Sequence, residues 1–311
     1  MRLMQPAVEI LLAAYHGEKY LPEQLDSLLS QTWENWRLTV SDDGSTDGTA
    51  GILDAYCARH PQRIVRVRHA GRFGNARDHF FWLMEQCKSP YMLLCDQDDV
   101  WYPRKVEKTM SALLEMERQA GAETPLLVFT DQTPTDERLR PIAPSLMRMQ
   151  RQFCERIDYR SLLMQNVVTG CAMGFNQALA SLALACESTS PIIMHDWWLG
   201  VVAARFGKVR YLDESTMAYR QHAGNSVGAK DVQSASYIAH KLAHLRGTKQ
   251  SIRRKKAQAR AFQATYAARL TAGDHAFLSA YARPRSGIAF YMRHRALIHG
   301  FWRFAGALLL G

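Results

Sequence analysis

The chain has 311 residues, of which 47% are hydrophobic and 22% charged, so it can bury a full core and has the composition of a soluble globular protein. No apolar run reaches the roughly 18 residues of a membrane-spanning helix, and the start lacks the order of a signal peptide. We therefore expect a cytoplasmic protein. Six cysteines without a CxxC pair argue against a disulfide framework and a cysteine zinc site.

The net charge of +10 is distributed unevenly along the chain. Residues 240–311 contain 14 Lys or Arg and a single acidic residue, so they carry +13 while residues 1–239 carry −3. This tail interleaves its cations with Phe290, Tyr291, Phe301, Trp302 and Phe304. Such a pattern is typical of a helix on an anionic membrane surface, and equally of a helix packed on the rest of the protein. We expect one catalytic domain over residues 1–229 and a basic helical C-terminal extension over residues 230–311.

Strand and helix patterns alternate through the first part of the chain. Short apolar runs predict buried strands, and amphipathic repeats that follow Pro or Asp predict helices between them. The expected strands are residues 8–15, 37–40, 64–68, 90–95 and 126–131, and the expected helices are residues 22–30, 47–56, 76–87 and 103–116. This alternation predicts an α/β fold with a mostly parallel sheet, whose ligand site lies at the carboxyl ends of the strands.

The second part of the chain has a less regular pattern. We expect an irregular stretch at 132–145, a strand or loop at 166–175 that leads into a helix at 177–186, and a short last strand at 209–212. Asp196 opens a further helix. From residue 231 onward the pattern is helical, with interruptions near Gly247, Gly273 and Pro284.

Acidic residues follow two of the predicted strands. Asp42 and Asp43 come after one strand, and Asp96 and Asp98 come directly after another. Because an ionised carboxylate is costly to bury unpaired, packing explains these positions poorly. In an extended backbone, residues 96 and 98 project to one face, where they can meet a divalent cation and the ribose of a nucleotide. Alone, each motif could be a solvated turn or a helix cap, but together they favour a site for a metal and a diphosphate.

Four segments resemble glycosyltransferase family 2, the inverting enzymes with the GT-A fold. They are Ala13-Ala14-Tyr15-His16-Gly17-Glu18-Lys19-Tyr20-Leu21, Gln31-Thr32-Trp33, Asp42-Asp43-Gly44-Ser45-Thr46-Asp47-Gly48-Thr49 and Asp96-Gln97-Asp98-Asp99-Val100-Trp101. The last is similar to the bacterial rhamnosyltransferase-like branch. The resemblance covers roughly residues 7–228 and implies a Rossmann-like, mostly parallel sheet flanked by helices.

The resemblance also implies roles for individual residues. Ala14 and Tyr15 would frame the nucleotide, Asp42 and Asp43 would contact its base and ribose, and Asp96 would face the ribose. Asp98 would bind Mg²⁺ or Mn²⁺, with Asp99 in support. Arg220 would offset phosphate charge, and His222 would bind the metal or a phosphate oxygen. Arg77 would contact the donor, although Arg77-Asp78-His79-Phe80 departs from the Arg-Asn-Phe of the family. Gly170 and Cys171 look like its acceptor-facing turn, and packing explains them equally well.

Asp196, in His195-Asp196-Trp197-Trp198, stands where this family places its general base. An inverting transfer needs a carboxylate that takes the proton of the acceptor hydroxyl while its oxygen attacks the anomeric carbon. A helix N-cap is a second role for Asp196 and is compatible with the first.

The sequence thus predicts a metal-dependent inverting glycosyltransferase. It would move a sugar, with rhamnose as a candidate, from a nucleotide-diphosphate donor to a hydroxyl acceptor. We expect the acceptor to be a lipid-linked saccharide in cell-surface polysaccharide synthesis, and the enzyme to lie on the inner face of the cytoplasmic membrane. One alternative, a sugar-phosphate nucleotidyltransferase, would want a Gly-rich, Arg-containing loop after the first strand. The other, a nucleic-acid-binding protein that uses the basic tail, leaves the acidic motifs without a purpose, so we expect no nucleic-acid partner.

Overall fold

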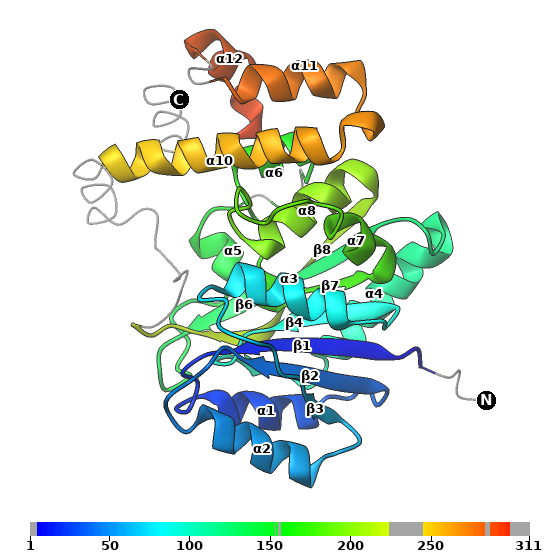
Figure 1. Ribbon diagram of the computed structural model, residues 1–311, viewed down its shortest axis with the longest axis vertical. Coiled ribbons are helices and arrows are strands. Elements are labelled where there is room, and N and C mark those ends of the chain that lie inside the picture. The colour runs from blue at the N-terminus through cyan, green and yellow to red at the C-terminus, as the bar shows by residue number, and fades with distance from the viewer. Residues whose placement is uncertain (1–4, 153, 155–156, 224–244, 284–286, 299–311) are drawn as a thin grey trace.

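The structure is a computed structural model that describes residues 5–152, 154, 157–223, 245–283 and 287–298. Figure 1 shows a central sheet with helices on both faces and a further layer of helices stacked above one of them. The chain therefore folds in layers, with the C-terminal helices as the outermost layer.

The eight-stranded sheet has the order β3-β2-β1-β4-β7-β6-β8-β5. Its strands are β1 Val8–Ala14, β2 Trp36–Asp42, β3 Ile64–Arg66, β4 Tyr91–Cys95, β5 Val100–Trp101, β6 Leu126–Thr135, β7 Met173–Asn176 and β8 Lys208–Arg220. Strands β3, β2, β1 and β4 are mutually parallel, as are β6 and β8, whereas β7 and β5 run antiparallel to their neighbours. The predicted α/β fold with a mostly parallel sheet is confirmed.

Alternation along the strands divides the apolar side chains between two faces of the sheet. In β1, Ile10 and Leu12 pack with the helices α1 Leu21–Leu29, α2 Thr49–Arg59 and α4 Lys105–Ala120. Leu11 faces the opposite side, which is covered by α3 Ala76–Gln86, α6 Tyr159–Met164, α7 Gln177–Ala183 and α8 His195–Phe206. Both faces are buried, which is why these strands read as nearly continuous apolar runs.

The two longest strands extend beyond their apolar segments. β6 continues through Pro134 to Thr135, where we had expected an irregular stretch, and β8 continues from the expected 209–212 to Arg220. The two strands pair along this polar part, with register shifts on either side of Asp131. Backbone hydrogen bonds between the strands hold this region, so hydropathy alone could not predict it.

The C-terminal extension consists of α10 Leu245–Thr265, α11 Ala272–Tyr281 and α12 Ile288–Arg293. α10 runs through Gly247, so the helix is not interrupted at that residue, while residues 224–244 and Pro284 lie outside the described residues. The interruption expected near Gly273 is found, since α10 ends at Thr265 and the capping box of Thr271 and Asp274 starts α11 at Ala272.

The extension packs on the rest of the protein. Phe262 of α10, Tyr266 just after that helix and Phe277 of α11 join the hydrophobic cluster that contains residues of α6 and α8. The predicted boundary between residues 229 and 230 lies outside the described residues. Among those that the structure describes, no helix has both the length and the apolar character needed to cross a membrane.

Candidate active site

A cavity of about 540 Å³ opens where β1, β2 and β4 end. β1 lies between the other two strands and runs parallel to both, so the segments after all three strands meet at one edge of the sheet. Of the residues expected in the site, the lining contains Ala14, Tyr15, Asp43, Asp96, Asp98 and Asp196. Asp42, Arg77, Arg220 and His222 lie outside that lining.

Asp43 is the member of its acidic pair that faces the cavity. Its carboxylate accepts hydrogen bonds from the backbone N–H groups of Phe73 at 2.6 Å and Gly74 at 2.8 Å, and its own N–H donates to the carbonyl of Ala14 at 2.8 Å. Asp42 instead lies 3.4 Å from the guanidinium of Arg66. Asp43 therefore joins the end of β2 to both neighbouring segments of the cavity wall.

Gln97, between the two aspartates that follow β4, binds the segment after β1. Its side-chain oxygen accepts from the N–H of Tyr15 at 2.7 Å, and its side-chain nitrogen donates to the carbonyl of Tyr15 at 2.7 Å. A Cβ atom on Gly17 would lie 2.5 Å from the same oxygen, which explains the glycine. Sequence reasoning missed Gln97, and only the adjacency of β1 and β4 could have indicated it.

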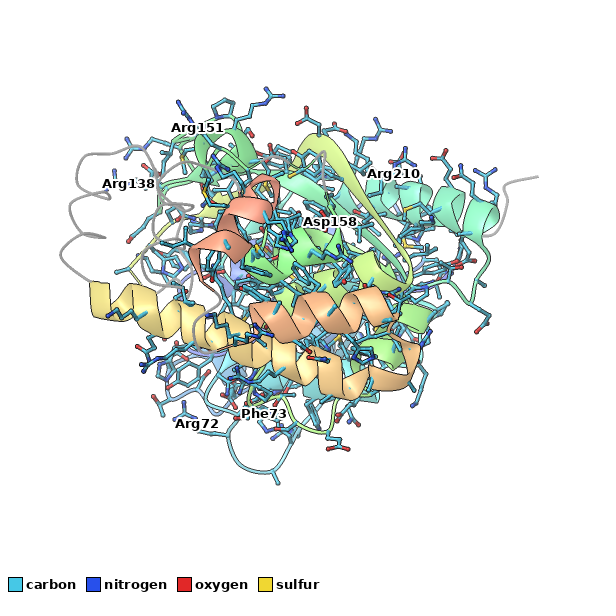
Figure 2. All side chains as sticks on the ribbon, turned by 90° about the horizontal axis from the view of Figure 1, so that it is seen from above. Arg72, Phe73, Arg138, Arg151, Asp158 and Arg210 are labelled. Carbon is cyan, nitrogen blue, oxygen red and sulfur yellow. The ribbon has the colours of Figure 1, made fainter. Side chains whose placement is uncertain are left out.

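Tyr15 and Arg72 stand together at the cavity. The guanidinium of Arg72 lies 4.5 Å from the centre of the Tyr15 ring, and its Nε donates to the carbonyl of Asp43 at 3.0 Å. Figure 2 shows Arg72 and Phe73 on one side of α10, with Arg138 and Arg151 on the other. An aromatic ring beside a cation suits a nucleobase and a phosphate.

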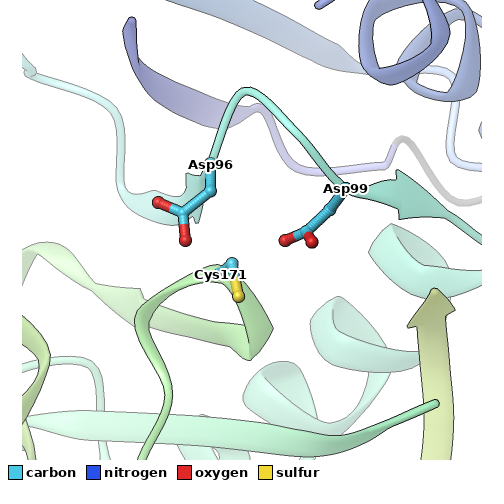
Figure 3. A group of neighbouring side chains, drawn as sticks. All are labelled: Asp96, Asp99 and Cys171. Carbon is cyan, nitrogen blue, oxygen red and sulfur yellow. The ribbon is translucent and has the colours of Figure 1, made fainter. Parts of the chain in front are cut away.

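The aspartates after β4 do not form the extended pair that we expected, because the chain bends at Gln97 and Asp98. The side chain of Asp98 contacts His222, with 2.8 Å between Oδ2 and Nε2. Asp96 turns instead toward Asp99 and Cys171 (Figure 3). One carboxylate oxygen of each aspartate and the Sγ atom of Cys171 all lie within 4.8 Å of one another. Burial, together with the charge of Asp98, raises the pKa of Asp96 to about 7.

Two of the arginines that we expected at the donor support loops behind the cavity. Arg220 is buried, donates through Nε to the carbonyl of Asp98 at 2.8 Å and pairs with Glu23. Arg77 pairs with Asp78 and donates to the carbonyl of Ile192 at 2.8 Å. Arg220 thus holds the backbone of the loop after β4, and Arg77 holds the segment that leads into α8.

Asp196 also lines the cavity, from the first turn of α8. The N-cap of this helix is Met194, so the capping role that we considered for Asp196 is not found. Its carboxylate accepts from the N–H of Gly170 at 3.1 Å and of Trp197 at 2.5 Å. Burial raises the pKa of Asp196 to about 7, so near neutral pH it can both accept and release a proton.

The C-terminal extension supports this wall from outside. Gln258 of α10 accepts a hydrogen bond from the N–H of Ile193 at 2.8 Å, and Lys255 lies 5.6 Å from the ring of Trp197 while donating to the carbonyl of Met164 at 2.7 Å. Ile193 and Trp197 both line the cavity. The helix therefore positions residues on both sides of Asp196 in the sequence.

Two buried histidines also line the cavity, and sequence reasoning assigned a role to neither. His79 is 2% exposed and His195 is 5% exposed. Burial lowers the pKa of His79 to about 4 and that of His195 to about 3, so both rings are neutral at physiological pH. Each can then donate one hydrogen bond and accept another.

Comparison with known proteins identifies the family. The model of glycosyl transferase family 2 matches residues 9–181, which is more than half of the chain, and the chain therefore belongs to this family. The dTDP-rhamnosyl transferase RfbG of Shigella flexneri is 26% identical over 238 residues, covering 73% of this chain and 76% of that protein. The Bacillus subtilis (strain 168) protein EpsE is 30% identical over 153 residues, but these cover 48% of this chain and only 54% of EpsE.

Two solved structures show the same fold. TarS 1–349 of S. aureus in complex with UDP-GlcNAc has a TM-score of 0.58 at 14% identity, covering 97% of this chain and 78% of that chain. The mannosyltransferase PcManGT of Pyrobaculum calidifontis, in complex with GDP-Man and Mn²⁺, has a TM-score of 0.51 at 14% identity, covering 98% of this chain and 86% of that chain. The predicted GT-A fold is confirmed.

Proposed function

We propose that this family member transfers a sugar with inversion from a nucleotide-diphosphate donor to a hydroxyl group of a saccharide acceptor. The observation that carries the proposal is a single cavity that is lined by Asp43, Asp96 and Asp98 and also by Asp196. The first three follow parallel strands, and the fourth begins a helix in the second half of the chain. The cavity can therefore hold the donor against one wall and the acceptor against the other.

Asp196 is the general base of this reaction. It takes the proton of the acceptor hydroxyl as that oxygen forms a bond to the anomeric carbon of the donor sugar. The bond from that carbon to the diphosphate breaks on the opposite side, and its electron pair leaves with the diphosphate. A pKa of about 7 suits this role, because about half of the carboxylates are then ionised at neutral pH and the group is basic enough to accept a proton.

Donor binding falls to the opposite wall. Ala14 and Tyr15 frame the nucleotide, and Asp43 hydrogen-bonds to its base or ribose from a position fixed by two backbone N–H groups. Asp96 faces the ribose. Arg77 and Arg220 act from behind this surface, since each holds a segment that bears a lining residue, and Asp42 pairs there with Arg66 of β3.

Asp98 and His222 fit the metal, Mg²⁺ or Mn²⁺. Their side chains approach to 2.8 Å and offer a carboxylate oxygen and an imidazole nitrogen, a set that suits Mn²⁺ better than Mg²⁺. When bound, the cation would neutralise charge on the diphosphate leaving group. Asp96, Asp99 and Cys171 fit such a cation less well, because burial raises the pKa of the Cys171 thiol far above its ordinary value and disfavours the thiolate.

The relatives suggest the donor sugar, and the cavity suggests the acceptor. Since RfbG is a dTDP-rhamnosyl transferase, dTDP-rhamnose is the first donor to test. The acceptor end presents the amides of Gln150, Gln152 and Asn166 together with Trp197, groups that bind sugar hydroxyls and sugar faces. We take the acceptor to be a lipid-linked saccharide of cell-surface polysaccharide synthesis.

The C-terminal extension adds a contact to the inner face of the cytoplasmic membrane. Lys249, Arg253 and Arg254 are exposed on α10, and Ile288 and Met292 are 65% and 58% exposed on α12. Cations beside apolar side chains suit an anionic lipid surface.

The aromatic residues of the extension divide into two groups. Tyr291 is buried and Phe290 packs against the same core, so these two stabilise the fold instead of facing lipid. Phe301, Trp302 and Phe304, which we also expected at the membrane, lie outside the described residues. The lipid contact proposed here therefore depends on α10 and α12.

Vesicle sedimentation tests this membrane contact. Arg253→Gln and Arg254→Gln should each weaken binding to anionic vesicles by about 1 kcal/mol, roughly fivefold, because each substitution removes one surface cation. The exposed Arg118→Gln, on α4, is the matched control. Equal binding of the wild type to neutral and anionic vesicles would reject the electrostatic contribution.

The enzymatic proposal is tested with a panel of nucleotide sugars in the presence of Mn²⁺, starting with dTDP-rhamnose. We expect slow hydrolysis of one donor, loss of this activity on chelation, and a product of inverted anomeric configuration by NMR. A chain that cleaves no nucleotide sugar, or that retains configuration, would overturn the proposal.

A further inference from the structure

His195 immediately precedes the proposed base and has no role in the reaction described so far. Its ring lines the cavity, is almost wholly buried, and packs against Phe80 with 4.3 Å between ring centres. Its Nδ1 atom is buried and has no hydrogen-bond partner among the residues that the structure describes. Because Nδ1 is closed off from the cavity, this ring can meet a ligand there only through its other nitrogen, Nε2.

Gly170 leaves room beside the other nitrogen of this ring. A Cβ atom at position 170 would lie 2.8 Å from Nε2 of His195 and 3.5 Å from Cβ of Asp196. Gly170 also lines the cavity and donates its N–H to Asp196. Any larger residue would therefore clash with the His195 ring and fill the space beside Asp196, so the glycine leaves room next to both side chains.

The proton of the neutral ring is best placed on Nε2. An N–H group buried without an acceptor is less tolerable than a buried lone pair, and Nδ1 is the nitrogen without a partner. His195 then presents a neutral N–H donor at the cavity wall at every physiological pH, since burial keeps its pKa at about 3.

This donor cannot serve the attacking hydroxyl itself. A hydrogen bond donated to the attacking oxygen would occupy a lone pair and lower the nucleophilicity of that oxygen. It can instead hold an oxygen on the neighbouring carbon of the acceptor sugar. The two side chains are adjacent in the first turn of α8 and border the same glycine, as a pair of adjacent hydroxyl groups requires.

We propose that His195 is a specificity-determining residue that donates a hydrogen bond from Nε2 to the oxygen next to the attacked hydroxyl, so that the acceptor of this enzyme is a vicinal diol of a saccharide. The inference rests on the proposed function and deepens it. It assigns to His195 the recognition of one hydroxyl and to Asp196 the activation of the other.

The test compares methyl hexosides that carry a vicinal diol with their monodeoxy analogues as acceptors for the full-length enzyme. The wild type should prefer the diol by about tenfold in kcat/KM, the contribution of one neutral hydrogen bond that a deoxy analogue leaves unmade. In His195→Phe this ratio should fall to about 1. His195→Gln, whose amide N–H can reach the place of Nε2, should restore part of the preference.

His79→Phe is the matched control, because His79 is also buried, neutral and part of the cavity lining, with an unpartnered Nε2. It stands beside Phe73 on the donor side, with 5.0 Å between ring centres, so its substitution should leave the diol preference near the wild-type ratio. Thermal unfolding and residual donor hydrolysis show whether each variant is folded.

Two outcomes would overturn the inference: a wild type that uses deoxy and diol acceptors equally well, or a His195→Phe variant that keeps the preference. A purely structural role would lower activity with both acceptors and leave their ratio unchanged. A wild type that cleaves no nucleotide sugar would instead reject the proposed function, so the two failures are distinguishable.

Discussion

The two walls of the cavity are built in different ways. The donor wall, made of Tyr15, Asp43, Asp96 and Asp98, is held by contacts between neighbouring strand ends, such as the hydrogen bond from Asp43 to the carbonyl of Ala14. The acceptor wall, made of Gly170, Ile193, His195, Asp196 and Trp197, depends on segments distant in the sequence. Gln258, for example, reaches it from 65 residues away.

This difference indicates what the C-terminal extension does for catalysis. The sheet alone suffices to position the donor residues, because parallel strands bring their ends together. The residues around Asp196 lie on a helix that packs on α10, so the extension stabilises the geometry of the proposed base whether or not it also binds a membrane. Predictions can therefore be made separately for each wall.

The largest effect is expected at the acceptor wall from Asp196→Asn. Removing the base should lower the rate of transfer by about 10²- to 10⁴-fold while donor affinity, measured by calorimetry with a nucleotide sugar, stays near the wild-type value. Asp213→Asn, at an exposed acid on β8, is the control. Should donor affinity fall in parallel with transfer, the two walls would not be separable.

Phe262→Ala tests the support of the acceptor wall. Phe262 is fully buried against Trp198, and its truncation should cost about 3–5 kcal/mol of unfolding free energy, measured by urea denaturation. Phe73→Ala, at a partly exposed ring on the donor side, should cost less.

For the same reason, a chain that ends at Ser236 should fail to fold, since it exposes the whole face that α10 covers. A stable, active protein of that length would show that the extension only docks.

Asp98→Asn tests the donor wall. If Asp98 binds the cation, this change should weaken donor binding in Mn²⁺ by about 10- to 100-fold and leave binding in chelator unaltered. The melting temperature should change little, because the side chain lies partly exposed at the cavity. Full wild-type activity after exhaustive chelation would contradict the metal role altogether.

The pH dependence of turnover sharpens the comparison further. Only the ionised form of Asp196 can accept a proton, so with a pKa of about 7 kcat/KM for the acceptor should fall about tenfold per unit as the pH drops below 7 and level off above it. Measurement at saturating donor separates this step from donor binding. An acid limb near pH 4 would mean that Asp196 behaves as a solvated carboxylate.

Much of the donor wall could be predicted from the sequence. Apolar runs that end in acidic residues predict parallel strands with carboxylates at one edge, and the structure does bring Asp43, Asp96 and Asp98 to one cavity. The roles of Gln97 and Arg220 could not be predicted, because they follow from which backbone groups lie opposite their side chains. The bend at Asp98, which separates it from Asp96, is likewise a property of the loop and of its contact with His222.

The sequence by itself determined the fold class, the order of the strands and helices, and the acidic residues that meet at the sheet edge, because strand and helix periodicity are local properties of the chain. Only the tertiary structure decided the packing of the C-terminal helices and the neutral state of His195 beside Asp196. An amphipathic helix has the same pattern whether its apolar face meets lipid or protein, and the pKa of a histidine depends on its burial by residues far along the chain.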